Sequence, residues 1–199
     1  IVSEADWNAR PKSAPTLADL ADPDRLAPIL AAQAPAWQPG TRHPRGGLYF
    51  EDFHVGSTIR HGLTRTVTQM DNMLFSNMTL NPQPLHIDAH FCETETQWGR
   101  PLMNSLFTLG LLIGISVNDT TVGTTIGNLG MTDVKFPAPV FEGDTIRVET
   151  EIIGARESKS RKDAGIVDFY HRAYKQDGTL VASVAQEGSL RERKEKPAG

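Results

Sequence analysis

The 199-residue sequence contains one cysteine, Cys92, so no disulfide framework is possible within it. It has no apolar run long enough to span a bilayer, because the longest, residues 106–117, is short and interrupted by serine, threonine and glycine. Positive charge is not in excess, since 20 Lys and Arg face 24 Asp and Glu. The first residues lack the basic and apolar regions of a signal peptide. We therefore expect a cytoplasmic protein with neither a nucleic-acid nor a membrane partner.

Proline is abundant in one region only. Residues 1–46 hold seven of the 13 prolines, and proline at that density interrupts helices. This region is predicted to be a Pro/Ala-rich N-terminal arm. Residues 191–199 are mostly charged and predict a solvated tail. The compact domain is expected to span residues 47–190.

The first part of that domain shows local start and stop signals. Residues 58–68 have the pattern of a strand. Thr68 and Asp71 form a capping-box pattern that opens a helix, and the prolines of segment 81–84 must end it. Asp88 is placed to cap a second short helix that extends to residue 97.

Residues 101–117 are apolar on every side, which predicts a buried helix. Gly110 and Gly114 form a smooth stripe suited to close backbone approach. The remaining pattern is that of strands, with a hairpin turn at residues 176–178. The expected strands are 121–136, 145–153, 165–175 and 180–190. An antiparallel sheet wrapped around one central helix is an α+β arrangement, the hot-dog fold.

The segment Asn81-Pro-Gln-Pro-Leu-His86 carries the chemistry. Its prolines restrict the backbone, and a histidine on a rigid loop can act as a general acid or base near neutral pH. The segment resembles the signature of the MaoC-like, R-specific enoyl-CoA hydratases, Gly-Asp-x-Asn-Pro-(Leu/Ile/Val)-His. Leu80 stands at the family's glycine, Asn81 at its catalytic aspartate and Gln83 at its asparagine. The resemblance extends over residues 48–191 and includes segments 49–56, 65–68 and 136–144.

The resemblance implies addition of water to an enoyl-CoA thioester, or the reverse dehydration. His86 would be the acid/base, Asn81 would position the water, and the Ser105 amide would receive the thioester oxygen. Gln83 and Asn104 are further candidates for substrate contact. The variant of the signature found here is similar to that of mesaconyl- and itaconyl-CoA hydratases, which implies a branched dicarboxylic acyl group. The family also implies a homodimer or a larger homo-oligomer, with no metal or redox cofactor and with CoA present as part of the substrate.

Several assignments remain open at this stage. Arg65 or Arg100 is placed to bind a second substrate carboxylate, and Asn104 and Ser105 have the alternative of acting only as a helix cap. The basic loop with Arg156, Lys159 and Arg161 is a candidate for the CoA phosphates, although charged hairpin tips are commonly just solvated.

Other readings of the same residues compete with hydration. A metal site at His86 and His90, four residues apart, is disfavoured because Pro84 predicts loop for residues 84–86. Cys92 is expected to fill space in the core. A hot-dog thioesterase is one rival function. The other is a non-catalytic acyl-CoA-binding subunit, because Asn81 replaces the family's aspartate and an amide cannot accept a proton from water.

Overall fold

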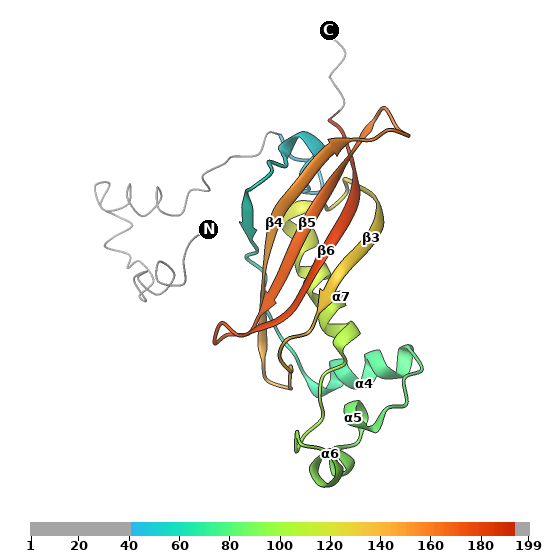
Figure 1. Cartoon of the computed structure of the whole chain (residues 1–199), viewed down its shortest axis with the longest axis vertical. Helices are drawn as coiled ribbons and strands as arrows, with labels where there is room; N and C mark the ends of the chain where they lie inside the picture. Colours follow the sequence, from blue (N-terminus) through green and yellow to red (C-terminus); the bar gives the residue numbers. More distant parts are fainter. Residues whose placement is uncertain (1–40, 194–199) are drawn as a thin grey trace, which may run out of the picture. The chain divides into compact units, whose positions relative to one another are not determined.

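The computed structural model of the chain describes residues 41–193 (Figure 1). Residues 1–40 of the predicted arm and 194–199 of the predicted tail lie outside this range. Residues 42–48 belong to the folded domain: Leu48 is 1 % exposed and donates its N–H to Thr120 O over 2.6 Å. At the other terminus, Arg193 forms an ion pair with the buried carboxylate of Asp52, with atoms 2.6 Å apart.

An antiparallel sheet forms one layer of the domain, with the strand order β1-β4-β5-β6-β3 and with β2 paired to β4. Consecutive strands β4, β5 and β6 are neighbours, as hairpin connections require. The β5–β6 turn matches the prediction, with Gly178 at φ 90° and its N–H donated to Lys175 O. The strands are β1 (Thr58–Arg60), β2 (Arg65–Thr66), β3 (Thr125–Lys135), β4 (Thr145–Glu157), β5 (Ala164–Tyr174) and β6 (Leu180–Arg191).

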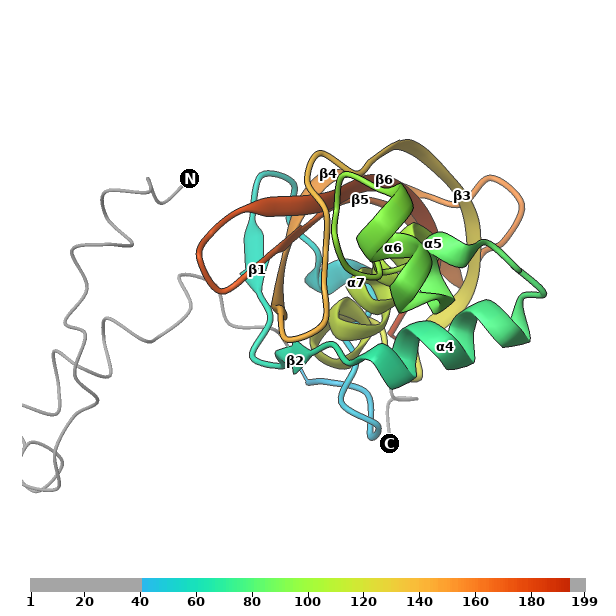
Figure 2. The ribbon, with the colours of Figure 1, turned by 90° about the horizontal axis from the view of Figure 1, so that it is seen from below.

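The sheet curves around the long helix α7, as the view along the domain shows (Figure 2). The shorter helices gather at the end of the domain where α7 begins (Figure 1). The helices are α4 (Gln69–Met78), α5 (Pro84–Ile87), α6 (Ala89–Glu95) and α7 (Ser105–Thr120), with a 3₁₀ turn η1 (Phe50–Asp52). No helix among residues 41–193 combines the length and apolar character needed to cross a membrane.

The core lies between α7 and the concave face of the sheet. Leu112 and Ile115 of α7 pack with Ile146 and Val148 of β4 and with Val184 of β6, and all five are at most 2 % exposed. Alternate residues of β4 from Ile146 to Ile152 are buried, which is the period-two pattern of a strand with one covered face. Burial of this apolar surface is the main force that holds helix and sheet together.

The expectation that α7 is buried on all sides is wrong. Leu106 is 60 % exposed, and Gly110, Gly114 and Asn118 continue the same open face. A Cβ built on Gly110 or Gly114 meets nothing within 4 Å, so no part of the described chain approaches this stripe. An all-apolar helix sequence indicates that each face avoids water, but it does not show whether the same chain covers every face.

The predicted local signals at helix ends are confirmed. Thr68 Oγ1 accepts from Asp71 N, and Asp71 Oδ2 accepts from Thr68 N over 2.9 Å, which completes the capping box. The helix ends at Met78, before the prolines. Asp88 Oδ1 caps α6 by accepting from Phe91 N over 2.9 Å, although α6 ends at Glu95 rather than at residue 97.

The predicted single strand 58–68 is two short strands, β1 and β2, and a buried histidine lies at the break. His61 is 7 % exposed, and its ring lies between Asp119 at the end of α7 (3.2 Å) and Thr150 of β4 (2.7 Å). Gly62 N–H also donates to Asp119 Oδ2 over 3.2 Å. The His61 backbone N–H still donates to Val148 O of β4, whereas the bonds to Asp119 tie the His61 ring and Gly62 to α7.

The same hydrogen-bonded chain continues into the sheet. Thr150 Oγ1 lies 2.8 Å from His171 Nδ1, and His171 Nε2 lies 2.9 Å from the Gln186 side-chain amide. We call these residues the distal cluster: Asp119, His61, Thr150, His171 and Gln186. Burial lowers the pKa of His171 to about 4, partly compensated by a hydrogen bond that Gln186 Oε1 can accept, and burial also lowers the pKa of His61.

Candidate active site

The signature segment places His86 on a single helical turn, α5, rather than on the predicted loop. Pro84 occupies the first position of this turn, where its missing N–H costs nothing, and His86 N–H donates to Gln83 O over 3.0 Å. The His86 side chain is half-buried. A short, proline-anchored turn therefore fixes the backbone from which the imidazole projects.

The tautomer of His86 follows from its one hydrogen bond. Nδ1 lies 2.7 Å from the backbone oxygen of Leu102, and a carbonyl oxygen can only accept, so Nδ1 carries the proton. In the neutral ring Nε2 is then unprotonated. Within residues 41–193 no hydrogen-bond partner meets Nε2. The ring is thus held by one nitrogen, and the other is available as a base.

Asn81, at the position of the family's aspartate, is tied into the loop. Its N–H donates to Ser76 O over 2.9 Å, and its side-chain oxygen accepts from Gln83 N over 3.1 Å. The residue before it, Leu80, has φ 55°, a left-handed conformation that suits the glycine of the family signature. The side chain of Gln83 is exposed. The roles of Asn81 in holding water and of Gln83 in binding substrate stay predictions.

The start of α7 supplies a candidate hydrogen-bond donor. Asn104 is the N-cap: it is 4 % exposed, and its side-chain oxygen accepts from Leu106 N over 3.0 Å. Asn104 therefore caps α7, and its contact with substrate stays a prediction. Ser105 follows as the first helical residue and is exposed, and in the described chain its N–H meets no acceptor. An unpaired N–H at the positive end of a 16-residue helix is suited to a developing oxyanion.

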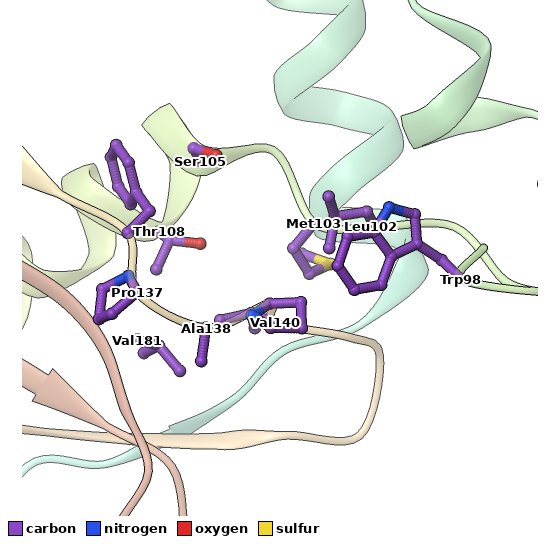
Figure 3. Close-up of a pocket in the computed structure, with 11 residues that line it drawn as sticks. Trp98, Leu102, Met103, Ser105, Thr108, Pro137, Ala138, Val140 and Val181 are labelled. Carbon is purple, nitrogen blue, oxygen red and sulfur yellow. The ribbon is translucent and has the colours of Figure 1, made fainter. Parts of the chain in front are cut away.

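A pocket of about 200 Å³ opens beside this helix start (Figure 3). Its lining is mostly apolar, and Ser105 and Thr108 contribute hydroxyl groups. Leu102 belongs to the lining, and its backbone oxygen accepts the hydrogen bond from the His86 ring. Leu102 therefore connects the pocket to the candidate base. The other lining residues are Trp98, Met103, Phe136, Pro137, Ala138, Pro139, Val140 and Val181.

The two arginines left open by the sequence have different surroundings. Arg65 is paired with Asp71 over 2.5 Å. The pKa of Asp71 is lowered, because hydrogen bonds from Thr68 and the charge of Arg65 outweigh the effect of burial, which alone would raise it. Arg100 lies 4.0 Å above the ring of Phe141, which contacts the pocket residue Trp98 with ring centroids 6.0 Å apart. Arg100 is therefore linked to the pocket lining through one aromatic ring, that of Phe141.

The basic loop lies at the opposite end of the sheet from α5 (Figure 1). Arg156 is paired with Glu187, and Arg161 is paired with Asp163 over 2.9 Å, while Lys159 is exposed. Within one protomer these side chains and His86 do not form one site. Phosphate binding by this loop stays a prediction.

The competing readings of nearby residues lose support. His86 and His90 lie on different helices, and no group of three His, Cys, Asp or Glu side chains within residues 41–193 is arranged to hold a metal ion. Cys92 is fully buried, and its thiol donates to Leu85 O over 3.3 Å. Burial raises the pKa of this thiol, which opposes a role as nucleophile.

Sequence reasoning missed Asn72 and Gln69, which both donate to the backbone oxygen of His86. It also found no partners for His61 and His171, which the structure joins in the distal cluster. Asn72 and Ser76, two polar residues one turn apart on the predicted helix, were the signal available for the buried face of α4.

The sequence is similar to a known protein family and to curated proteins. The profile of the MaoC-like domain family matches residues 52–171, more than half of the chain. The chain belongs to the MaoC-like domain family. Mesaconyl-CoA hydratase of Cereibacter sphaeroides is 30 % identical over 147 residues, which cover 74 % of this chain and 42 % of that protein. Beta-methylmalyl-CoA dehydratase of Chloroflexus aurantiacus is 32 % identical over 121 residues, 61 % of this chain and 34 % of that protein.

Solved structures confirm the hot-dog fold of this MaoC-like domain. A monoamine oxidase regulatory protein from Archaeoglobus matches with TM-score 0.66 and 30 % identity, over 74 % of this chain and 97 % of that one. A Mycobacterium tuberculosis protein with a double hot-dog fold matches with TM-score 0.68 and 22 % identity, over 77 % of this chain and 47 % of that one. The chain spans less than half the length of the two curated relatives.

Proposed function

We propose that this MaoC-like domain is a hydro-lyase that adds water to a short enoyl-CoA thioester or removes it from the 3-hydroxyacyl-CoA. One observation carries the proposal: His86 is held through Nδ1 by Leu102 O, with Nε2 unpaired, and Leu102 lies three residues before Ser105, whose N–H at the start of α7 is also unpaired in the described chain. A base and an oxyanion donor next to an apolar pocket are the parts that the reaction requires. The names of the curated relatives support this class of reaction.

The reaction can run with one acid/base group. Nε2 of His86 takes a proton from water as the water oxygen bonds to Cβ of the enoyl group. The Cα–Cβ double-bond electrons move toward the thioester, and the enolate oxygen accepts the Ser105 N–H. The proton on Nε2 then passes to Cα, which completes the addition of one water. Asn81 contributes a hydrogen bond that positions the water, since an amide cannot take its proton.

The proposed acyl group is small, branched and dicarboxylic, as in mesaconyl-CoA. The relatives named for mesaconyl-CoA and beta-methylmalyl-CoA support this choice. The charged residue best placed for a second carboxylate is Arg100, through its contact with Phe141 next to Trp98, because Arg65 is already paired with Asp71. We therefore favour Arg100 over Arg65 for that role.

The proposed assembly is a homodimer. Strand β3 is at the edge of the sheet and pairs only with β6 in the described chain, and its Leu129 is 55 % exposed. The open stripe of Gly110 and Gly114 on α7 offers a second surface for close approach. Exposed strand edges are normally covered in stable proteins. A second copy would supply the second hot-dog unit that double hot-dog chains carry in one chain.

The test follows loss of enoyl-thioester absorbance for crotonyl-, mesaconyl- and itaconyl-CoA, with free CoA thiol measured in the same samples. Hydration predicts loss of absorbance without thiol release, fastest for a dicarboxylic substrate. Thiol release would identify a thioesterase and contradict the proposal. Binding of all three thioesters without turnover would favour the non-catalytic alternative, for which the amide at Asn81 is the supporting observation. Sedimentation of the same preparation is expected to give twice the protomer mass.

A further inference from the structure

The buried face of α4 is polar, the reverse of an ordinary amphipathic helix. Asn72 and Ser76, one turn apart, are fully buried, whereas Met70, Leu74 and Met78 are between 54 % and 79 % exposed. Burial of a side-chain amide is costly unless its hydrogen bonds are satisfied. The partners of Asn72 therefore explain why this residue stands at a core position.

Asn72 makes three hydrogen bonds to three separate segments. Its Nδ2 donates to His86 O over 2.8 Å and to Leu102 O over 3.0 Å. Its Oδ1 accepts from Asn104 N over 2.9 Å. One amide thus joins α5, the strand-like segment before α7 and the N-cap of α7.

The partners of Asn72 are bonded to, or adjacent in sequence to, the groups of the proposed reaction. Leu102 O also accepts Nδ1–H of His86, so Asn72 and the imidazole share one acceptor. Asn104 N belongs to the residue directly before Ser105, the proposed oxyanion donor. The bond from Asn104 N to Asn72 and the cap of Leu106 N satisfy two N–H groups at this helix start, whereas the Ser105 N–H has no acceptor in the described chain.

We propose that Asn72 is a positioning residue that fixes the His86 imidazole and the start of α7 relative to each other. This inference rests on the proposed hydration, and it adds a residue that the family signature does not contain. Gln69 has a smaller share of the same role, because its Nε2 donates to His86 O over 3.0 Å but reaches neither Leu102 nor Asn104. Misplacement of reacting groups by about 1 Å is enough to slow a reaction on the order of a hundredfold.

Asn72→Leu and Asn72→Asp test the role, because both nearly keep the volume and both remove the two donors. We expect kcat for the best thioester of the panel to fall about 30-fold or more, with KM changed less than about threefold. Gln69→Ala should lower kcat by about threefold. Val167→Ala, a buried change near the start of β5, is the stability control and should lower Tm without this loss of kcat.

A second readout does not depend on turnover. The ¹⁵N chemical shifts of His86 should report the Nδ1–H tautomer in the unchanged chain and in Val167→Ala, and a mixture of tautomers in the Asn72 variants. If the unchanged chain hydrates no thioester, the proposed function is contradicted. The comparison of His86 tautomers then still tests the role of Asn72, because it needs no turnover. Folded Asn72 variants with an unchanged His86 tautomer, or with kcat within threefold of the unchanged chain, would overturn the inference. If neither Asn72 variant folds, an unchanged tautomer in Gln69→Ala would do the same.

Discussion

Two buried polar groups stand at the two ends of α7, and they use histidine in opposite ways. In the distal cluster, both nitrogens of His61 and both nitrogens of His171 have a partner at 3.2 Å or less, and neither residue is more than 7 % exposed. At the start of α7, His86 has a partner on Nδ1 alone and is half-buried. A histidine with both nitrogens paired holds the fold together, whereas one with a free nitrogen can react.

Proton counting sharpens this contrast. The distal cluster has four hydrogen-bond contacts in a row from Asp119 to Gln186. When both imidazole rings are neutral, His61, Thr150 and His171 each carry one proton that can be donated in these contacts. Asp119 accepts, so each of the three protons points toward Asp119, and His171 Nε2 then carries no proton for the Gln186 oxygen 2.9 Å away. With neutral rings, every proton of the distal cluster is thus bound within the cluster, and none is available for exchange with a substrate.

The largest stability effect is expected from acid acting on the distal cluster. The pKa of His171 is about 4 in the fold and 6.5 in an unfolded chain, so the stabilisation is complete above pH 6.5 and is lost as pH falls toward 4. The free energy of unfolding should drop by about 2 to 3 kcal/mol between pH 7.5 and 4.5 from this residue. Urea unfolding at both pH values measures it.

The matched variants for this measurement are His171→Gln and His90→Gln. His171→Gln removes the titrating ring and should flatten the pH dependence, whereas His90 is exposed on α6 and its replacement should leave the dependence unchanged. An equal acid loss in all three proteins would show that the distal cluster does not titrate as proposed. The pH floor of 4.5 stays above the range in which Asp71, with its lowered pKa, would take a proton.

A smaller effect is expected at the reactive end, from backbone strain. Leu80 adopts φ 55° with its side chain 88 % exposed, so Leu80→Gly relieves strain at almost no cost in burial. The variant should be about 0.5 to 1 kcal/mol more stable, since the relief exceeds the extra entropy of an unfolded glycine. Gln83→Gly, at φ −64° in the same loop, should be destabilising. Thermal unfolding of both variants tests the comparison, and a loss of stability in Leu80→Gly would contradict it.

The elements that depend on neighbouring residues could be predicted from the sequence. The Thr68–Asp71 capping box, the Asp88 cap, the turn before Gly178 and the alternation in β4 all follow from short-range rules. That His86 and the start of α7 form one site stays a prediction; the structure bonds the His86 ring to Leu102, three residues before the helix.

What could not be predicted depends on partners far along the chain. His61 breaks the strand because Asp119 and Thr150 lie beside it, 58 and 89 residues away in sequence. Asn72 bonds to residues 14 to 32 positions further on. The open face of α7 could not be predicted either, because hydrophobic periodicity does not tell how many chains cover a helix.

The central claim is that His86 is the acid/base of a hydration site and that other histidines of the domain are not. The most direct test is kcat/KM for mesaconyl-CoA hydration in the unchanged chain, in His86→Ala and in His90→Ala. The account predicts a loss of about a hundredfold or more in His86→Ala, with Tm little changed, and less than about twofold in His90→Ala. A His86→Ala protein that hydrates the thioester at the rate of the unchanged chain would contradict it.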